Sequence, residues 1–397
     1  MRIASVCRVL PSPDQPAAGA FVLRRLAAMA DRADLQVIQP VPYLPILRPL
    51  PSWAREASHT AGGMTIAHAP MMYLPGALKS LDGRWLERSV YSKLAALHQA
   101  RSIDAIDAHF GYPDGVGCVR AAKRLDIPVF VTLRGMEVDA LRTRGIRSQL
   151  VRALRDANGC IAVSHSLRDL AVDVGVDPQD ILVAPNAVDR AAFRPGDKAA
   201  ARQQLGLPPD APLIVSVGHL IAGKGHSVLI RALAALRKTR PSARLAIIGG
   251  PAYEPDHPRV LAEIARETGL QEATLFVGAV KPDAVALWLQ AADVFALATE
   301  REGCCNSVLE ALAVGLPVVT TPAGDNPRFV QDGVNGQLVG IGDIDGTAAA
   351  LDSVLGRVWD QVGISRALAV GDWSDVAGQV LRFIDVKRTR IPAAGTH

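Results

Sequence analysis

A glycine-rich stretch with one lysine is the first part of the sequence that could do chemistry. Residues 215–230 read VSVGHLIAGKGHSVLI, and Gly218, Gly223, Lys224 and Gly225 nearly spell the phosphate-binding pattern GxxxxGK[ST]. The last position of that pattern needs a hydroxyl to hold magnesium, and Gly225 has none. The stretch is therefore either an NTPase loop that lacks one group or a different device for holding phosphate.

Two glutamates form a second candidate site. In EREGCCNSVLEALAVGLPVVTT, residues 300–321, Glu302 falls in the loop before a predicted helix and Glu310 lies eight positions later, inside it. A helix N-terminus binds anions, and carboxylates accept hydroxyl donors, so a ligand with both phosphate and vicinal hydroxyls would fit. Two glutamates at this spacing are by themselves more often surface charge. The strand–loop–helix–strand setting favours a site, to which the backbone of the following residues would contribute: Gly303, Cys304, Cys305, Asn306 and Ser307.

Apolar runs that alternate with helical patterns must position these residues. This alternation predicts parallel sheets covered on both faces. The pattern breaks in a polar, proline-containing stretch and restarts, which places a domain boundary near residues 190–210. We predict an α/β protein with one doubly wound domain over residues 1–192 and another over 200–370, and a helix at about 373–390 that packs back on the first domain. Tandem domains of this kind bind ligands in the cleft at the carboxyl ends of their strands.

Composition narrows the class of protein. The chain has 397 residues, of which 49% are hydrophobic and 21% charged, so it is long enough for two cores and is not disordered. A net charge of +4 suits anionic ligands, whereas the 5% aromatic content and the lack of a basic tail argue against nucleic acid. Five scattered cysteines without CxxC spacing indicate a reducing, cytoplasmic compartment. The N-terminal apolar run is broken by Arg8 and Pro11 and suits a buried strand better than a signal peptide.

A resemblance to a known family links these stretches. The glutamate stretch resembles the E-x7-E motif of the retaining glycosyltransferases of family four, which have the GT-B fold of two Rossmann-like doubly wound domains facing across a cleft. Further segments resemble the family in the same order along the chain: SPDQPAAGAFVLRRLAAMA (12–30), DAHFGYPDG (107–115), VTLRGMEVD (131–139), APNAVDRAAFRP (184–195) and VGHLIAGKGHSVLIRAL (217–233).

The resemblance implies an activity and a role for each donor-side residue. The protein would move a sugar from a nucleoside-diphosphate donor to an acceptor hydroxyl with retention, and the leaving phosphate would take the acceptor proton. By similarity Lys224 contacts the diphosphate together with His219, which answers the question raised by the glycine-rich stretch. Glu310 would hold the ribose hydroxyls and Glu302 the hydroxyls of the donor sugar. No cofactor and no metal are expected.

The first domain would hold the acceptor. The resemblance places His109 near the reacting sugar and Gly19 beside the donor phosphate, where glycine permits close approach of the backbone. Arg134 and Glu137 are candidates on the acceptor side. A hydrogen-bonded structural histidine and an ordinary loop glycine stay open as alternatives for the first two residues.

Three positions depart from the family pattern. The family usually has arginine at the position of His219, glycine at Ala187 and histidine at Arg134. Arginine is always charged, whereas histidine near pH 7 is only partly cationic. Either the diphosphate charges His219, or another basic group such as Arg301 compensates. Acceptor contacts around Arg134 transfer least well.

A basic helix is predicted over residues 141–158. One face carries Ile146, Leu150, Leu154 and Ala157, and four arginines flank it: Arg144, Arg147, Arg152 and Arg155. A solvated helix with a buried stripe is one interpretation, and a surface that rests on anionic lipid is the other. The family often uses lipid-linked acceptors, which supports a peripheral location at the inner membrane face.

Other residues that suggest chemistry have simpler explanations. Asp343 and Asp345 form a D-x-D pair of the kind that holds metal in other glycosyltransferases, but they precede a helical segment and are explained as helix caps. Cys304 and Cys305 are taken as loop residues whose backbone matters. Bacterial polysaccharide or glycolipid synthesis is the expected setting. A different sugar-nucleotide enzyme such as an epimerase, an NTPase and a non-catalytic binding module stay open as alternatives.

Overall fold

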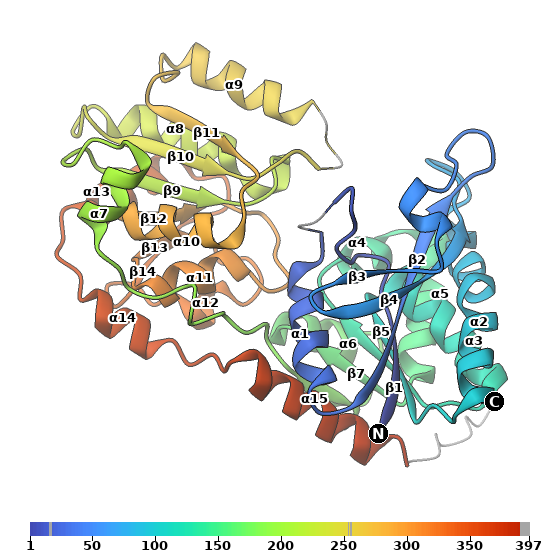
Figure 1. Ribbon diagram of the computed structural model, residues 1–397. Coiled ribbons are helices and arrows are strands. Elements are labelled where there is room, and N and C mark those ends of the chain that lie inside the picture. The colour runs from blue at the N-terminus through green and yellow to red at the C-terminus, as the bar shows by residue number, and fades with distance from the viewer. Residues whose placement is uncertain (16–17, 253, 255, 390–397) are drawn as a thin grey trace. The chain divides into compact units, whose positions relative to one another are not determined.

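The chain forms two compact units in the computed structural model (Figure 1). The structure describes residues 1–15, 18–252, 254 and 256–389. The first unit contains residues 1–187 together with the segment that starts at Trp373, and the second contains residues 188–372. Val188 and Phe193, which precede the predicted start of the second domain at residue 200, are buried in the core of the second unit.

The first unit is built on an eight-stranded sheet in the order β3-β4-β2-β1-β5-β6-β7-β8. Neighbouring strands are parallel except β3 and β4, which pair antiparallel. The chain moves outward from β1 to β2 and later restarts at β5 on the other side, so β1 and β5 flank a topological switch point. The strands are β1 (Arg2–Val6), β2 (Asp34–Tyr43), β3 (Ser58–Ala61), β4 (Met64–Met72), β5 (Ala105–His109), β6 (Val129–Leu133), β7 (Gly159–Ala162) and β8 (Ile181–Val183).

Helices cover this sheet because their apolar faces need a partner surface. They are α1 (Ala20–Ala30), α2 (Asp82–Ala100), α3 (Val116–Leu125), α4 (Glu137–Arg142), α5 (Arg144–Asp156), α6 (His165–Asp173) and α15 (Trp373–Lys387), with the short helical turns η1 (Ser52–Arg55), η2 (Lys79–Leu81), η3 (Gly111–Gly115) and η4 (Pro178–Asp180).

The second unit has an all-parallel sheet of six strands in the order β11-β10-β9-β12-β13-β14, with its switch point between β9 and β12. Alternate residues of β9 enter different cores: Leu213 and Val215 one, Ile214 the other. The strands are β9 (Leu213–Val217), β10 (Arg244–Ile248), β11 (Thr274–Gly278), β12 (Val294–Leu297), β13 (Val318–Thr320) and β14 (Gly336–Leu338). The helices are α7 (Lys198–Leu205), η5 (Ala222–Lys224), α8 (His226–Leu236), α9 (His257–Glu267), α10 (Pro282–Ala291), α11 (Asn306–Val314), α12 (Asn326–Phe329), α13 (Ile344–Leu355) and α14 (Gln361–Ala367).

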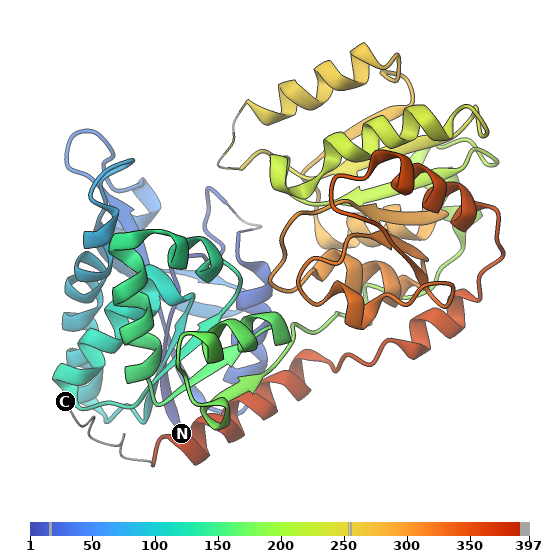
Figure 2. The ribbon, with the colours of Figure 1, turned by 180° about the vertical axis from the view of Figure 1, so that it is seen from behind.

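Helix α15 returns to the first unit and lies along α1 (Figures 1 and 2). Val380 and Ile384 are completely buried in the core that contains Leu26 and Met29 of α1. The Phe383 ring packs edge-on against Phe130, with centroids 5.9 Å apart. Residue 390, where the sequence places the end of this helix, lies outside the described residues.

Candidate active site

Lys224 and Glu302 meet in the second unit although they lie far apart in the sequence. The Lys224 ammonium is 2.6 Å from the Glu302 carboxylate, and the two side chains are 22% and 7% exposed. Lys224 ends η5 after β9, and Glu302 follows β12, the strand beside β9. The backbone N–H of Glu300 donates to the Gly223 carbonyl over 2.9 Å, and so does the Thr299 hydroxyl over 3.1 Å. The two loops therefore form one structure at the switch point, where open α/β sheets bind ligands.

Gly225 explains why the near-match to the NTPase pattern lacks its hydroxyl. Its φ is +69°, in the left-handed region, and a Cβ atom at this position would lie 1.9 Å from the carbonyl oxygen of Ala298. Because β12 ends directly against this loop, no side chain fits. The serine or threonine of an NTPase loop is sterically excluded here.

Helix α11 presents one polar face. Six of its nine residues are buried, and Asn306, Ser307 and Glu310 keep accessible surface. These three residues share a face because residues four apart on a helix lie above one another. Cys305 is the N-cap residue, and its side chain makes no cap hydrogen bond. Burial raises the pKa of the Cys305 thiol well above its usual range, which makes this side chain inert.

The loop that carries Glu302 and Gly303 packs closely against the loop that follows β13. Gly324, which follows β13, has a φ of +56°, and a Cβ atom there would lie 2.6 Å from the carbonyl oxygen of Glu302. Cys304 is half-buried in the same loop. This close backbone approach, together with the ion pair to Lys224, holds the Glu302 carboxylate in one place.

His219 follows β9 on the same edge and stays exposed. Partial desolvation of its ring, and then the positive charge of Lys224, lower the pKa of His219 below its ordinary value. In the protein alone this side chain is therefore neutral at pH 7. Arg301 is exposed in the loop beside Glu302.

In the first unit, His109 is the centre of a buried network. Its ring is completely buried at the end of β5, with Nε2 3.1 Å from the Asp107 carboxylate and 3.0 Å from the Ser5 hydroxyl. Arg134 donates to Nδ1 over 3.1 Å. Arginine can only donate, so Nδ1 is the acceptor and the ring proton lies on Nε2. Burial lowers the pKa of His109 to about 4 although Asp107 opposes the shift, so the ring is neutral at pH 7.

These contacts fit the structural alternative for His109, because both ring nitrogens have partners inside the protein. Arg25 completes the network: its guanidinium donates to Asp107 over 2.7 Å and to the Thr132 hydroxyl over 3.0 Å, with 1% of the side chain exposed. A catalytic role for His109 stays a prediction.

Arg134 and Glu137 also lie inside the first unit. Arg134 is 8% exposed, and burial lowers its pKa to about 9. Glu137 is completely buried and accepts backbone N–H donors from Gly111 (2.7 Å), Arg134 (3.1 Å) and Gly135 (2.7 Å). Glu137 therefore ties the loops after β5 and β6 together, and these contacts make it a positioning residue rather than a side chain that meets an acceptor.

Gly19 has a structural reason to be glycine. Its φ is +62° at the start of α1, and a Cβ atom would lie 2.0 Å from the carbonyl oxygen of Val9. The close approach that requires glycine is thus to the chain itself.

Sequence reasoning did not identify Asp107 and Arg25. Asp107 lies two positions before His109, so strand alternation places both on one face and could have paired them. Arg25 gave no such signal, because an arginine in an amphipathic helix is normally exposed.

The predicted basic helix corresponds to α5, which is shorter than the predicted range 141–158: residues 141 and 142 belong to α4, and Ala157 is the C-cap residue and not part of the apolar face. Ile146, Leu150 and Leu154 are buried. The four arginines are exposed: Arg144, Arg147, Arg152 and Arg155. The Arg155 guanidinium donates to the Val174 carbonyl over 2.8 Å.

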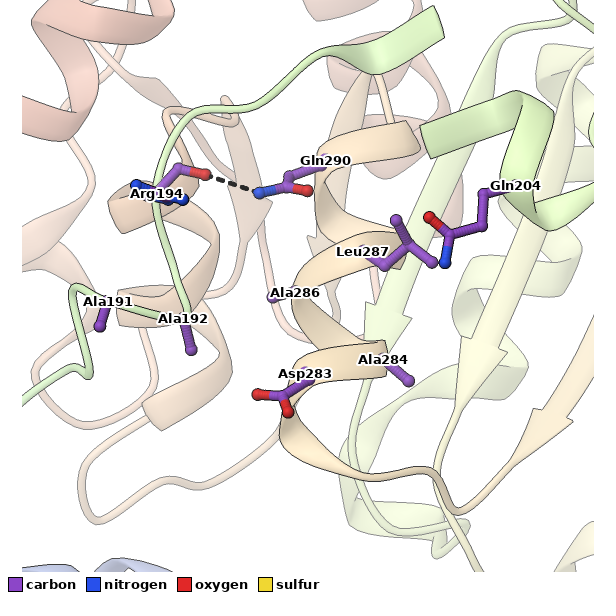
Figure 3. A pocket seen from close by; sticks show the side chains of 9 residues that line it. All are labelled: Ala191, Ala192, Arg194, Gln204, Asp283, Ala284, Ala286, Leu287 and Gln290. Atoms are coloured by element: carbon purple, nitrogen blue, oxygen red, sulfur yellow. Dashed lines mark hydrogen bonds between the residues drawn. The ribbon is translucent and has the colours of Figure 1, made fainter. Parts of the chain in front are cut away.

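Four further observations bear on ligands and on the membrane. Asp343 accepts the backbone N–H of Gly346 over 2.8 Å as the N-cap of α13, which confirms the cap interpretation. Among the described residues, no three His, Cys, Asp or Glu side chains gather as a metal ion would need. Nor does the described part of the chain contain a helix long and apolar enough to cross a bilayer. A hollow of about 420 Å³ lies beside α10, and none of the predicted site residues lines it. Figure 3 shows the side chains that line this hollow.

Comparison with known families and curated proteins gives consistent matches. Residues 197–357 match the model of the glycosyl transferases group 1, and residues 51–192 match the model of Glycosyltransferase Family 4. A D-inositol 3-phosphate glycosyltransferase of Acidothermus cellulolyticus is 31% identical over 62% of this chain and 58% of its own length. One of Xylanimonas cellulosilytica is 29% identical over 83% of this chain and 84% of its own. The first relatives are thus matched over roughly half to two thirds of their length.

Solved structures share the arrangement of elements. Sucrose-phosphate synthase from Thermosynechococcus elongatus has a TM-score of 0.77 at 20% identity and covers 97% of this chain and 99% of its own. Anabaena Alr3699/HepE, solved with UDP and glucose, has a TM-score of 0.76 at 18% identity, with 97% and 100% covered. At these identities the likeness establishes the fold.

Proposed function

Because the chain belongs to the family 4 glycosyltransferases and has the GT-B fold, we propose that it moves a sugar from a nucleoside-diphosphate sugar to an acceptor hydroxyl, with retention of the anomeric configuration. The observation that carries the proposal is the Lys224–Glu302 pair at the switch point of the second unit. A relative in fold that holds UDP and glucose supports a nucleotide-sugar donor.

The geometry suggests how the donor binds. Lys224 and the amino end of α11 would bind the diphosphate, since both offer positive charge to an anion. The polar face of α11 would take the nucleoside, with Glu310 accepting the ribose hydroxyls. Glu302, fixed by Lys224 and backed by Gly324, would accept hydroxyls of the donor sugar.

The reaction then needs no side-chain nucleophile. The bond between the anomeric carbon and the diphosphate oxygen breaks, and the acceptor oxygen bonds to that carbon on the same face. The acceptor proton passes to the leaving phosphate. Lys224 stabilises the negative charge that develops on the diphosphate, and preorganised charge of this kind is worth about 2.7 to 4 kcal/mol.

Two variants and one matched control test the donor site. Lys224→Ala is expected to lower kcat about 10²- to 10³-fold, and Glu310→Ala to weaken the thermal shift produced by the donor. Lys238→Ala, at an exposed lysine of the same unit, is expected to leave both unchanged. A panel of UDP-, GDP- and ADP-sugars identifies the donor, and unfolding curves check that each variant is folded.

Two results would contradict the proposal. One is turnover of Lys224→Ala within about tenfold of the wild type. The other is activity that is abolished by EDTA and restored by magnesium, because the proposal includes no metal. Product analysis with a labelled donor distinguishes transfer from epimerisation and from binding without turnover.

We place the acceptor on the first unit. The exposed arginines of α5 support a peripheral location on an anionic membrane and a lipid-linked acceptor, as in polysaccharide or glycolipid synthesis. The curated relatives are named for D-inositol 3-phosphate, so inositol phosphates belong in the panel of water-soluble acceptors. Transfer to a soluble acceptor that is indifferent to vesicles would argue against the lipid-linked class.

A further inference from the structure

Two neighbouring loops of the first unit project apolar side chains into solvent. One follows β2 and the other follows β4, its parallel neighbour in the sheet. The backbone N–H of Tyr73 donates to the Tyr43 carbonyl over 2.9 Å, so both loops leave the sheet at the same edge. Ile46 is 95% exposed and Leu47 81% in the first loop, and Leu78 is 57% exposed in the second.

The two loops repeat a short sequence. Residues 43–48 read YLPILR and residues 73–79 read YLPGALK, so each loop runs from Tyr-Leu-Pro to an exposed leucine followed at once by a cation. The two cations converge on one ring: Lys79 is 3.6 Å and Arg48 5.7 Å from the centre of Tyr73. The loops therefore form one surface, which we call the Tyr-Leu-Pro edge (residues 43–48 and 73–79).

The backbone of this edge is held in an unfavourable conformation. Ile46 has a φ of +69° and Leu78 a φ of +50°, both in the left-handed region. That region is disfavoured for every residue with a Cβ atom and most of all for a β-branched one. Burial of the side chains does not compensate, because both point into solvent. Strain of this kind at exposed apolar residues indicates a function.

Charge narrows the choice of partner. Residues 43–51 and 72–81 contain no aspartate or glutamate. The edge continues onto α5, because the Gln149 side chain donates to the Ser80 carbonyl over 2.9 Å and η2 packs on that helix. Arg144 and Arg147 are exposed on α5. Asp82, the first acidic residue after the second loop, is buried and interacts with Lys79. The exposed part of the edge therefore offers apolar tips and arginines, which match the interface of an anionic bilayer better than a protein surface of mixed charge.

We propose that the Tyr-Leu-Pro edge inserts Ile46, Leu47 and Leu78 into the interface of an anionic lipid bilayer, while Arg48, which is exposed, binds a lipid phosphate. The Lys79 ammonium is instead buried over the Tyr73 ring. This deepens the proposed function and rests on its membrane location, since it gives the acceptor-binding unit a defined depth and orientation. The edge and the arginines of α5 would contact the bilayer together.

Sedimentation with vesicles of phosphatidylglycerol and phosphatidylcholine tests the proposal without donor or acceptor. The double variant Ile46→Ser/Leu47→Ser is expected to bind these vesicles at least about tenfold more weakly. Arg48→Gln is expected to weaken binding to these vesicles about fivefold and to leave binding to vesicles of phosphatidylcholine alone unchanged. Val358→Ser is the matched control, because Val358 is 98% exposed in the second unit.

A backbone variant separates insertion from misfolding. Ile46→Gly relieves the left-handed strain and removes the apolar tip, so it is expected to raise the melting temperature while it weakens vesicle binding. Unchanged vesicle binding by the double variant would overturn the proposal. A double variant that binds vesicles normally but no longer transfers sugar to a soluble acceptor would also overturn the proposal, because that result would assign the loops to the acceptor site. Vesicle binding stays measurable even if no sugar donor is found, so failure of the proposed function would be recognised separately.

Discussion

Lys224 and Glu302 form an ion pair that links two loops, and this bears on how the donor enters. A donor phosphate near Lys224 would compete with Glu302 for the ammonium group. The Glu302 carboxylate is 7% exposed, and a buried charge that loses its partner is destabilised unless new donors replace it. The hydroxyls of the donor sugar would supply those donors, so binding of the phosphate and of the sugar is expected to be coupled.

At the residue scale, donor affinity should depend on pH through His219. Its pKa is lowered in the protein alone, and an adjacent diphosphate would raise it, so donor binding takes up a proton. Affinity should therefore rise as pH falls from about 8 to about 6. Calorimetry in buffers of different ionisation enthalpy would detect the proton. His219→Arg should bind the donor with little dependence on pH, and an equal pH dependence in that variant would assign the effect to another group.

At the element scale, periodicity predicted the strands and helices that carry the donor site. The Glu302 loop and α11 follow from a strand–loop–helix pattern in which each element has a clear period. The Arg25–Asp107 pair could not be predicted, because an ion pair buried between a helix and a strand depends on packing between segments 82 residues apart. The sequence left a hydrogen-bonded structural histidine open for His109 but could not name its partners, because they lie on β1, on β5 and after β6.

Gly225 gives a test at the same scale. Gly225→Ser would complete the NTPase pattern, but its Cβ would collide with the Ala298 carbonyl at 1.9 Å. We expect the second unit to lose about 2 kcal/mol or more of unfolding free energy, without gain of magnesium-dependent ATP hydrolysis. Gly223→Ser is the matched control, because a Cβ at Gly223 meets nothing within 4 Å. Equal stability of the two variants in urea unfolding would show that the loop can move away from β12.

At the scale of the whole molecule, the first unit is discontinuous in sequence. In the sequence the second unit, residues 188–372, separates the two parts of the first unit. Helix α15, which follows the second unit, supplies buried side chains to the core of the first unit. The stability of the first unit therefore depends on a segment that follows the entire second unit.

Ending the chain at Asp372 would test this dependence. The truncation removes Val376, Ala377, Val380 and Ile384 from the core, a loss on the order of 5 kcal/mol or more. That is comparable with the whole stability of a typical domain, so calorimetry should show the transition of the first unit lost. The second unit should still give a thermal shift with the donor. Val386→Ser, at an exposed position on α15, should leave both transitions unchanged.

The return of α15 also determines the order of events during synthesis. The ribosome releases β14 and α14 before it makes α15, so the half of the protein that is translated later can complete its fold sooner. Until α15 is made, the nascent N-terminal half exposes the apolar side chains of α1 and β7 on which α15 packs, and chaperones bind exposed apolar surface of this kind. We therefore expect the nascent chain to stop depending on chaperones when α15 leaves the ribosomal exit tunnel.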